Sequence, residues 1–283
     1  MEQGETMDYY RWIFKRKSFH LFRGAAKLTR EDLAGLEAFL ATVVPLTPDI
    51  KIGIRIVNEA ETTCRRGADF CILFYSEKKD GYLRNIGYIG EQIDLYLASQ
   101  NIGALWFGIG KPDKMQADGL DFVIMMAIAG MPEDKFRQDM FRSKRKPVEE
   151  TWCGETLGVA EIVRFAPSAC NTQPWITENT GDELMVCRYK KPGKRGIMPA
   201  DRVRYYNKID MGIYLFFLEV CLSHEGCIYR RRLYEDTTDD SAEKTLIAAY
   251  RIVRETENGE KADGTACGDI AGAVCGSGDV SFA

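Results

Sequence analysis

Apolar positions along the chain follow two spacings, one typical of helices and one typical of strands. After Thr29, a residue type that favours helix N-caps, with Asp32 three residues later, apolar side chains recur every three or four positions as far as Val43. Pro45 and Pro48 then prevent the helix from continuing. The spacing therefore predicts a helix that is capped by Thr29 and ends before Pro45.

Four other segments have helical spacing. One begins near Asp8, which we expect to cap it, and runs into the basic residues that follow Phe14. Two of the others are followed by glycine, a natural helix stop, at Gly103 and Gly226. These three later helices are predicted over residues 86–102, 157–165 and 210–224.

The remaining regular segments read as strands. Ile52, Ile54 and Ile56 alternate with other residues, whereas residues 69–75 are almost continuously apolar, which indicates a strand buried on both faces. Strands are predicted over residues 50–57, 69–75, 104–109, 122–130, a short segment around Trp175, 183–189, 228–234 and 248–254. Helices and strands in this order predict an α+β fold.

The predicted helix stops repeat along the chain. Pro45 and Pro167 each follow a helix and are 122 residues apart, while Gly103 and Gly226 are 123 residues apart. This agreement favours an internal duplication, and the alternative is a chance likeness between two helix, loop and strand units. The expected parts are two similar halves and a flexible glycine-rich tail, over residues 1–147, 148–254 and 255–283.

Charge and composition exclude several classes of protein. The 38 Lys and Arg residues against 42 Asp and Glu residues give a net charge of −4, so the molecule as a whole does not attract nucleic acid or an anionic membrane. Any anion site must be local. The sequence has no secretory-signal pattern and no run of about 18 apolar residues, and its nine cysteines form no C-x-x-C pair. We expect a cytoplasmic protein with reduced thiols.

Two basic segments are candidates for binding a local anion. In an extended backbone Arg16, Ser18 and His20 would face one side, and three donors on one face suit a phosphate. The alternative is a solvated basic end of the first helix, where cations offset the helix dipole. The second segment is equally weak when taken alone, and its cations are Arg142, Lys144, Arg145 and Lys146.

The loop at residues 166–175, with the sequence APSACNTQPW, is the most informative segment. Two prolines fix its path, small residues allow a flat ligand to approach, and Ser168, Asn171 and Gln173 supply polar contacts. The alternative is a rigid turn in which Asn171 and Gln173 tie down the backbone. Cys170 could be a reactive thiol, although an inert small residue is the simpler interpretation.

A glycine-rich segment, GALWFGIGKP at residues 103–112, includes a predicted strand. The backbone amides of Gly108 and Ile109 could face a ligand there without obstruction by side chains. The segment lacks the pattern of a Walker A loop, and the chain has no Rossmann dinucleotide pattern. The two histidines, His20 and His224, lack the neighbours of a metal site or a hydrolase triad, so no metal is expected.

Together these segments resemble the nitroreductase flavoproteins. APSACNTQPW is close to the family's proline-serine-x-x-asparagine-x-glutamine-proline-tryptophan signature, and RKSFHLF is similar to its amino-terminal arginine-x-serine-x-arginine-x-aromatic motif. LWFGIGKP resembles the family's strand over the flavin, and KRKP resembles its basic carboxy-terminal clamp. The resemblance covers most of residues 8–254 and is to the subgroup in which two family-like halves are fused in one polypeptide.

The resemblance implies a nitroreductase-like FMN-binding fold, duplicated so that one chain mimics the usual homodimer. In ordinary members one FMN lies at the dimer interface, with its phosphate on one subunit and the PSxxNxQPW loop on the other. Here the first half's counterpart of that loop, at residues 45–49, has lost the Ser and Asn, and the second half has no R-x-S-x-R segment. One FMN per chain is therefore expected.

The same resemblance assigns roles to individual residues. Phosphate contacts are implied for Arg16, Ser18, Lys144 and Arg145, backbone contacts near the flavin N5 for Gly108 and Ile109, and ring contacts for Pro167, Ser168, Ala169 and Asn171.

Two positions depart from the family pattern. His20 stands where the amino-terminal motif has Arg or Lys, and we keep it among the cofactor-binding residues. Histidine, unlike Arg or Lys, loses its positive charge near neutral pH, so FMN affinity is expected to weaken as pH rises. Ser143 occupies a clamp position that often has Lys, which leaves Arg145 as the safer assignment.

By the resemblance the protein is an FMN-dependent oxidoreductase in which no side chain acts as a nucleophile. NADH or NADPH would be the reductant, and the acceptor would be a nitroaromatic, a quinone or another electron-poor small molecule. Two alternatives stay open: a flavin-destroying or dehalogenating relative on the same fold, and a flavin-binding module without turnover. Neither nucleic acid nor a membrane is an expected partner, and the duplication is compatible with a monomer.

Overall fold

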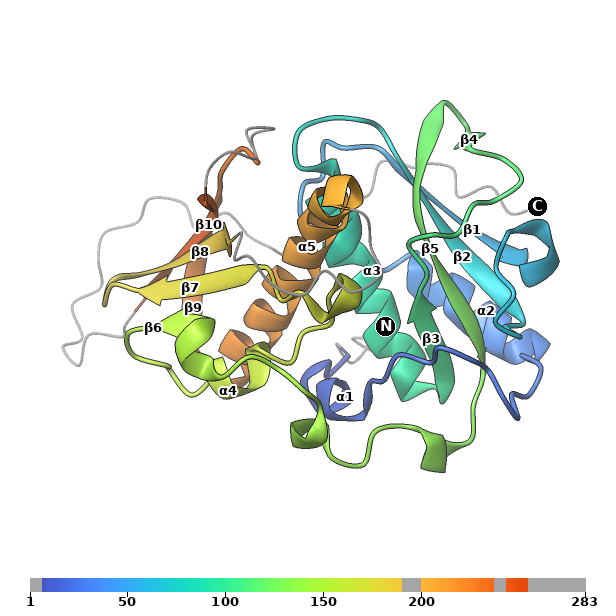
Figure 1. Cartoon of the computed structure of the whole chain (residues 1–283), viewed down its shortest axis with the longest axis horizontal. Coiled ribbons are helices and arrows are strands. Elements are labelled where there is room, and N and C mark those ends of the chain that lie inside the picture. Colours follow the sequence, from blue (N-terminus) through green and yellow to red (C-terminus); the bar gives the residue numbers. More distant parts are fainter. Residues whose placement is uncertain (1–6, 190–199, 237–242, 254–283) are drawn as a thin grey trace, which may run out of the picture.

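Two β-sheets lie on either side of a central pair of long helices (Figure 1). The computed structural model describes residues 7–189, 200–236 and 243–253. The central helices are α3 (Tyr82–Ser99) and α5 (Ala200–His224), one from each part of the chain. The predicted tail at residues 255–283 lies outside the described residues.

The first sheet is antiparallel and has the order β1-β2-β5-β3, with the short β4 paired to β5. Its central strands β2 and β5 are mostly buried, as the continuous apolar sequence of β2 predicts. Its strands are β1 (Ile52–Asn58), β2 (Phe70–Ser76), β3 (Ile102–Trp106), β4 (Gln116–Ala117) and β5 (Leu120–Gly130).

The second sheet has the order β6-β7-β8-β10-β9. β6 runs parallel to β7, and the other pairs are antiparallel. Its strands are β6 (Trp152–Cys153), β7 (Trp175–Asn179), β8 (Glu183–Tyr189), β9 (Ile228–Leu233) and β10 (Lys244–Val253). A segment of about twenty residues, 131–151, joins the two sheets, with single 3₁₀ turns at Glu133–Lys135, Met140–Arg142 and Val148–Glu150.

The shorter helices surround this framework. They are α1 (Tyr10–Lys15), α2 (Arg30–Leu40) and the single turn α4 (Ala160–Val163). The predicted N-cap of α2 is confirmed: Thr29 accepts a hydrogen bond from the Asp32 N–H, and Asp32 accepts one from the Thr29 N–H. At α1 the N-cap residue is Tyr9, one position after the prediction, while the Asp8 carboxylate accepts from the Tyr10 N–H at 3.2 Å.

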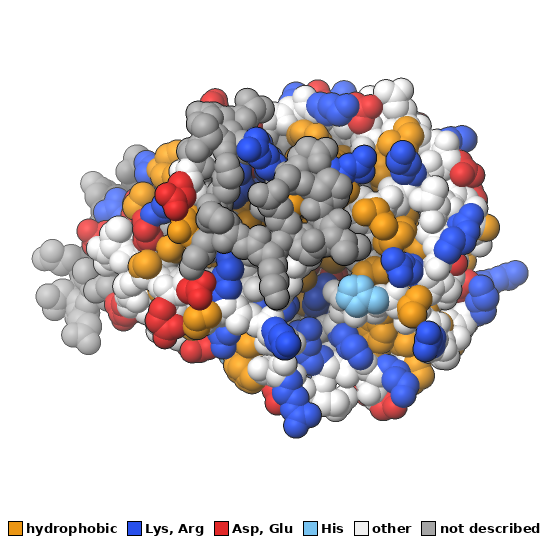
Figure 2. Space-filling model, in the orientation of Figure 1, with side chains coloured by type: hydrophobic (Ala, Val, Ile, Leu, Met, Phe, Trp, Pro, Cys, Tyr) orange, Lys and Arg blue, Asp and Glu red, His pale blue; other side chains and the backbone are white. Residues whose placement is uncertain are grey.

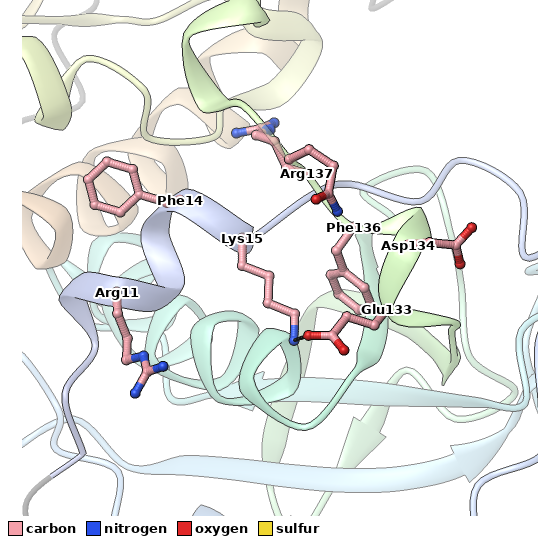
Figure 3. A pocket seen from close by; sticks show the side chains of 8 residues that line it. Arg11, Phe14, Lys15, Glu133, Asp134, Phe136 and Arg137 are labelled. Carbon is pink, nitrogen blue, oxygen red and sulfur yellow. Dashed lines mark ion pairs between the residues drawn. The ribbon is translucent and has the colours of Figure 1, made fainter.

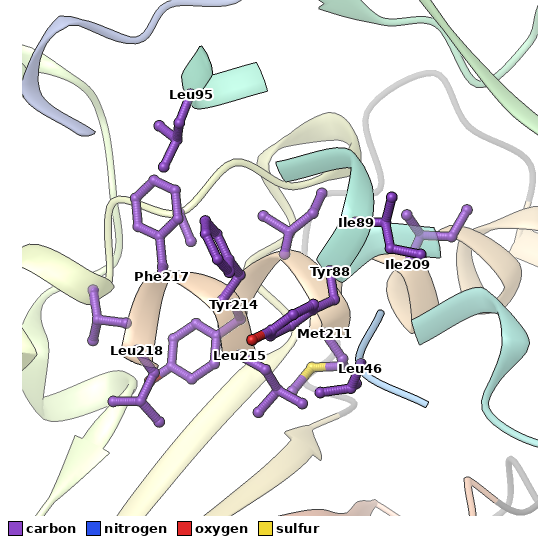
Figure 4. Packing of buried hydrophobic residues seen from close by; sticks show 14 of the residues in the cluster. Leu46, Tyr88, Ile89, Leu95, Ile209, Met211, Tyr214, Leu215, Phe217 and Leu218 are labelled. Carbon is purple, nitrogen blue, oxygen red and sulfur yellow. The ribbon is translucent and has the colours of Figure 1, made fainter. Parts of the chain in front are cut away.

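Two glycines allow the close packing of α3 on α5. A Cβ atom on Gly87 would lie 2.0 Å from the carbonyl oxygen of Ile209, and one on Gly212 would lie 1.9 Å from that of Arg84. A side chain at either position would therefore force the helices apart. Buried residues of both helices form the centre of the core, as Figure 4 shows for Tyr88, Ile89, Ile209, Met211, Tyr214, Leu215, Phe217 and Leu218.

The prediction that Gly103 ends a helix was wrong. Helix α3 begins at Tyr82 and ends at Ser99, and Asn101 (φ 58°) takes the left-handed conformation that we assigned to the glycine. Gly103 lies inside β3, where a Cβ atom would be 2.5 Å from Met131 and 2.9 Å from Phe19. Gly226 (φ 69°) does follow α5, but the 123-residue offset no longer joins two helix stops. The duplication and its boundaries stay predictions.

Other boundaries also moved. Helix α5 begins at Ala200, ten residues before the predicted start, because polar residues on its first turns hid its length. In place of the helix predicted over 157–165, the structure has the four-residue helix α4. The two-residue strands β4 and β6 were not predicted, because they are too short to show a pattern in the sequence. Among the described residues no helix combines the length and apolar character that crossing a bilayer requires.

Candidate functional site

A cavity of about 530 Å³ lies between the end of β3, the loop that follows α4, and α5. It brings together seven of the eleven predicted cofactor residues: Ser18, His20, Gly108, Ile109, Pro167, Ser168 and Ala169. Arg16, Lys144, Arg145 and Asn171 do not line it. The remaining lining residues are Arg66, Leu105, Trp106, Phe107, Ile124, Cys170, Tyr206, Ile209, Asp210 and Ile213. The cavity therefore has mostly apolar walls with a few polar groups, as ligand pockets do.

The loop after β3 offers free backbone donors. Within the described residues, the N–H groups of Gly108 and Ile109 donate no hydrogen bond, whereas the Gly110 N–H bonds to Phe107. The Gly108 carbonyl accepts a hydrogen bond from the Tyr206 hydroxyl. A Cβ atom on Gly108 would lie 2.6 Å from the Tyr206 ring, so glycine is needed for this contact. The loop can present two amides to an acceptor atom in the cavity.

The signature loop at residues 166–175 has a strained backbone. Cys170, Asn171 and Gln173 have φ angles of 50°, 56° and 47°, in the left-handed region that residues other than glycine rarely adopt. Such conformations persist only where the surroundings impose them, and they concentrate at functional sites. Residues 167–170 of this loop line the cavity, and Cys170 is exposed there as a free thiol.

Side-chain hydrogen bonds hold this backbone in place. The Gln173 side chain accepts from the Lys146 N–H at 2.8 Å and donates to Asn171. Asn171 accepts from Arg145 Nη1 at 3.0 Å and donates to the Lys144 carbonyl at 3.0 Å. Asn171 and Gln173 therefore hold the backbone of the loop, as the rigid-turn alternative expected. Residues 167–170 of the same loop line the cavity.

An arginine cluster lies next to the loop, formed by Arg16, Arg137, Arg145 and Arg164. Burial, together with the charges of the other three, lowers the pKa of Arg145 to about 10. Burial, then the charge of Arg16, lowers the pKa of Arg137 to about 10, and Asp94 opposes this effect. Among the described residues no carboxylate forms an ion pair with Arg137 or Arg145. The cluster is thus short of negative charge.

Arg16 differs from these two because its charge is already compensated. It is 2% exposed, and its Nε lies 2.8 Å from Asp94 Oδ2. Its Nη2 donates to Ser18 Oγ at 3.1 Å, and Ser18 lines the cavity. The carboxylate of Asp94 also accepts from the indole N–H of Trp106 at 3.0 Å. Arg16 therefore positions Ser18, while Asp94 already neutralises the positive charge that Arg16 could offer to a ligand.

A second, more open hollow of about 730 Å³ lies beside the cluster (Figure 3). Lys15 lines it, pairs with Glu133 at 3.8 Å and donates to Asn101 at 2.6 Å. Arg137 extends away from the Lys15–Glu133 pair in Figure 3. Blue Lys and Arg side chains gather around a histidine on the face shown in Figure 2. Cations are thus gathered locally in a molecule whose formal net charge is −4.

Four residues of the cavity and the adjacent arginine cluster were not predicted from the sequence. Arg137 has no motif around it, and Arg66 lines the cavity with its guanidinium 5.4 Å from the centre of the Phe107 ring. Tyr206 and Asp210 lie on α5, and an acidic residue at the start of the apolar stretch of this helix was the available signal for Asp210. In the described residues no group of three His, Cys, Asp or Glu side chains could hold a metal ion.

Comparison with known proteins gives matches of two kinds. The family described as "Putative TM nitroreductase" matches residues 8–221. A crystal structure described as a "putative nitroreductase" from Thermotoga maritima shares 20% identity at a TM-score of 0.56, covering 89% of this chain and 96% of that one. This similarity shows a nitroreductase-like α+β fold. Comparison with curated proteins gives no match.

Two other solved structures match about half of the chain. A nitroreductase family protein from Clostridium difficile is 14% identical, with a TM-score of 0.39, and covers 51% of this chain and 95% of its own. A crystal structure from Desulfovibrio desulfuricans is described as a "putative nitroreductase in complex with fmn". It is 14% identical, with a TM-score of 0.37, and covers 51% of this chain and 95% of its own.

Proposed function

Since the chain belongs to the nitroreductase family that matches residues 8–221, we propose that it is an FMN-dependent oxidoreductase. One observation carries the proposal: a single cavity is walled by both segments that the sequence resemblance assigns to one flavin. Gly108 and Ile109 come from the first sheet's side, and Pro167, Ser168 and Ala169 come from the second. NADH or NADPH is the proposed reductant, and an electron-poor small molecule is the proposed acceptor.

The residues present fit FMN in three respects. The volume of about 530 Å³ and the largely apolar walls suit a flat ring, which small side chains at Ser168 and Ala169 allow to approach. The free N–H groups of Gly108 and Ile109 suit a ring nitrogen that accepts hydrogen bonds. Arg137 and Arg145, which lack carboxylate partners among the described residues, suit a phosphate.

Bound FMN would supply the redox chemistry, accepting a hydride from NADH or NADPH and reducing the acceptor. The chain would orient and shield the ring. The loop amides of Gly108 and Ile109 would donate hydrogen bonds to it, and the strained loop at residues 167–170 would cover its other side. Arg145, held by Asn171 and the Phe165 carbonyl, would fix the phosphate without a change of conformation.

We also propose one FMN site per chain, with its first half over residues 1–147 and its second half over residues 148–254. A cavity of this composition supports this arrangement, since Ser18 and His20 line it from the first half and the signature loop lines it from the second. Of the predicted contacts, Lys144 is exposed and its carbonyl bonds to Asn171, so we assign the phosphate to Arg137 and Arg145 before Lys144.

The test is a flavin spectrum of the purified full-length chain, before and after addition of FMN and then of NADH or NADPH under anaerobic conditions. A flavin absorbance that binds stoichiometrically and bleaches on addition of the reductant supports the proposal. Protein that takes up no FMN overturns it. Bound FMN that neither nucleotide reduces would instead establish a flavin-binding module without this turnover.

A further inference from the structure

Asp210 is an acidic residue in the wall of an otherwise largely apolar cavity. It lies on α5, is 3% exposed, and has Ile209 and Ile213 beside it in the wall. Its Oδ1 accepts a hydrogen bond from the Ala169 N–H at 2.9 Å. Its Oδ2 is buried and has no hydrogen-bond partner among the described residues. A buried oxygen without a partner is costly unless a ligand completes it.

Among the described residues, no positive charge compensates this carboxyl group. The other titratable or charged groups that line the cavity are His20, Arg66, Cys170 and Tyr206, and none of them is bonded to Asp210. The nearby cations on the packed helices have other partners: Lys208 bonds to Asp236, and Arg84 bonds to the carbonyls of Tyr234 and Ile247.

The protonated form of the acid fits this environment. A neutral carboxylic acid keeps one oxygen as an acceptor and turns the other into an O–H donor. The Ala169 N–H donates to the acceptor oxygen Oδ1. The O–H on Oδ2 is left to donate to a group in the cavity. In agreement, burial raises the pKa of Asp210 well above its usual range, although the Ala169 bond opposes the shift.

We propose that Asp210 is a ligand-contacting residue of the flavin site, which fixes the signature loop through Oδ1 and donates a hydrogen bond from a protonated Oδ2 to an acceptor atom of the bound ring. This inference rests on the proposed function for the identity of the ring. A neutral donor tolerates added negative charge on the ring after reduction, whereas a carboxylate would repel it. The site thereby favours the reduced cofactor.

The first measurement needs no ligand. Infrared difference spectra of wild-type protein minus Asp210→Asn at pH 7 should contain the carbonyl stretch of a protonated carboxyl group. The Asn side chain keeps the shape and the Ala169 bond. A carboxylate signal in its place overturns the inference, whether or not the protein binds FMN.

The second measurement is FMN affinity by fluorescence quenching, from pH 6 to pH 10. Asp210→Leu removes both hydrogen bonds and should weaken binding about tenfold or more, while Asp210→Asn, which still donates, should recover most of that loss. Wild-type affinity should fall at alkaline pH relative to Asp210→Asn, because only the acid can ionise. Asp236→Asn, which alters a buried acid paired with Arg188 away from the cavity, is the control.

The two proposals fail separately. If neither wild-type protein nor any variant binds FMN, the proposed function is overturned. If FMN binds but Asp210→Leu binds it as tightly as wild type, with the same pH profile as Asp210→Asn, the role of Asp210 is overturned. Should Asp210→Leu fail to fold, the infrared spectrum and the wild-type against Asp210→Asn pH comparison still decide.

Discussion

Gln173 and Lys146 are joined by two hydrogen bonds of opposite kinds. The Gln173 Oε1 accepts from the Lys146 backbone N–H at 2.8 Å, and the Lys146 Nζ donates to the Gln173 backbone carbonyl at 2.8 Å. This pair connects the basic KRKP segment to the signature loop, two regions 27 residues apart in the sequence. The strained loop therefore keeps its shape through a contact with the chain that precedes the second sheet.

Gln173→Ala should loosen this connection. It removes the side-chain acceptor of the Lys146 N–H and the amide donor to the Asn171 oxygens, so we expect a loss of roughly 1–3 kcal/mol in the free energy of unfolding. FMN affinity should fall as well, because the loop at residues 167–170 is no longer held. Urea denaturation and flavin titration measure both effects. Gln116→Ala, an exposed position on β4, should change neither; equal losses in the two variants would contradict the assignment.

The arginine cluster predicts stabilisation by anions. Arg137 and Arg145 have pKa values lowered to about 10, so their ionised forms disfavour the folded state at pH 7, and a bound anion should relieve this cost. Inorganic phosphate should raise the melting temperature of wild-type protein more than an equal ionic strength of chloride. Arg137→Gln and Arg145→Gln should lose most of this rise, and Arg142→Gln, whose side chain is 88% exposed, should keep it.

Riboflavin distinguishes a phosphate contact from a ring contact. Because riboflavin lacks the phosphate, Arg137→Gln and Arg145→Gln should weaken FMN binding about 10- to 100-fold and leave riboflavin binding nearly unchanged. Isothermal titration with the two flavins gives the ratio. A parallel loss for both flavins would mean that these arginines support the fold or the ring, and the phosphate assignment would be wrong.

Glu91 predicts a pH dependence of stability. It is fully buried on α3, and burial, followed by the charge of Asp94, raises its pKa well above the usual range while Arg16 opposes the shift. Because the folded-state pKa exceeds the unfolded one, the protonated acid favours folding at low pH, and this contribution is lost as pH rises through the folded pKa.

Glu91→Gln removes that titration. The free energy of unfolding of Glu91→Gln minus that of wild type should therefore grow as pH increases from 5 to 9, with a slope of at most about 1.4 kcal/mol per pH unit. Denaturant titrations at several pH values give the difference. Glu37→Gln, at an exposed position on α2, provides the comparison and should show a flat difference; a flat line for Glu91→Gln would refute the prediction.

The glycine contact between the central helices gives a prediction for the whole fold. Gly87→Ala or Gly212→Ala places a methyl group about where a backbone carbonyl already lies, so each should cost at least the upper part of the roughly 1–3 kcal/mol typical of overpacking. Gly35→Ala is the matched control, since its Cβ would meet only the Tyr96 hydroxyl at 3.1 Å and alanine favours the helix. Thermal unfolding of the three variants should rank Gly35→Ala as the most stable.

The sequence predicted best where one physical signal acted alone. The Thr29 capping box and residues 183–189 of β8 are local patterns, and both are observed. Gly103 was misread because a glycine after a helix usually ends it, whereas here the space beside Phe19 and Met131 requires the glycine. The first turns of α5 were missed because Arg202 and Arg204 interrupt its apolar pattern.

The sequence motifs account for part of the lining of the cavity. The signature loop and the Gly108 segment both line one cavity, but Asn171 of that loop does not line it and instead accepts a hydrogen bond from Arg145. Arg137 and Asp210 take their properties from burial and from neighbours distant in sequence. Those conditions exist only after the chain has folded, so spacing within a segment could not identify the two residues.

The arrangement of the cavity also determines how the site responds to dilution. A pocket assembled from two separate subunits dissociates when the protein is dilute, and its occupancy then depends on two concentrations. Here residues 131–151 join the two walls covalently, so their effective concentration toward each other is fixed by the backbone. Occupancy of the proposed site should therefore follow the concentration of free ligand alone, down to the lowest amounts of protein that a cell maintains.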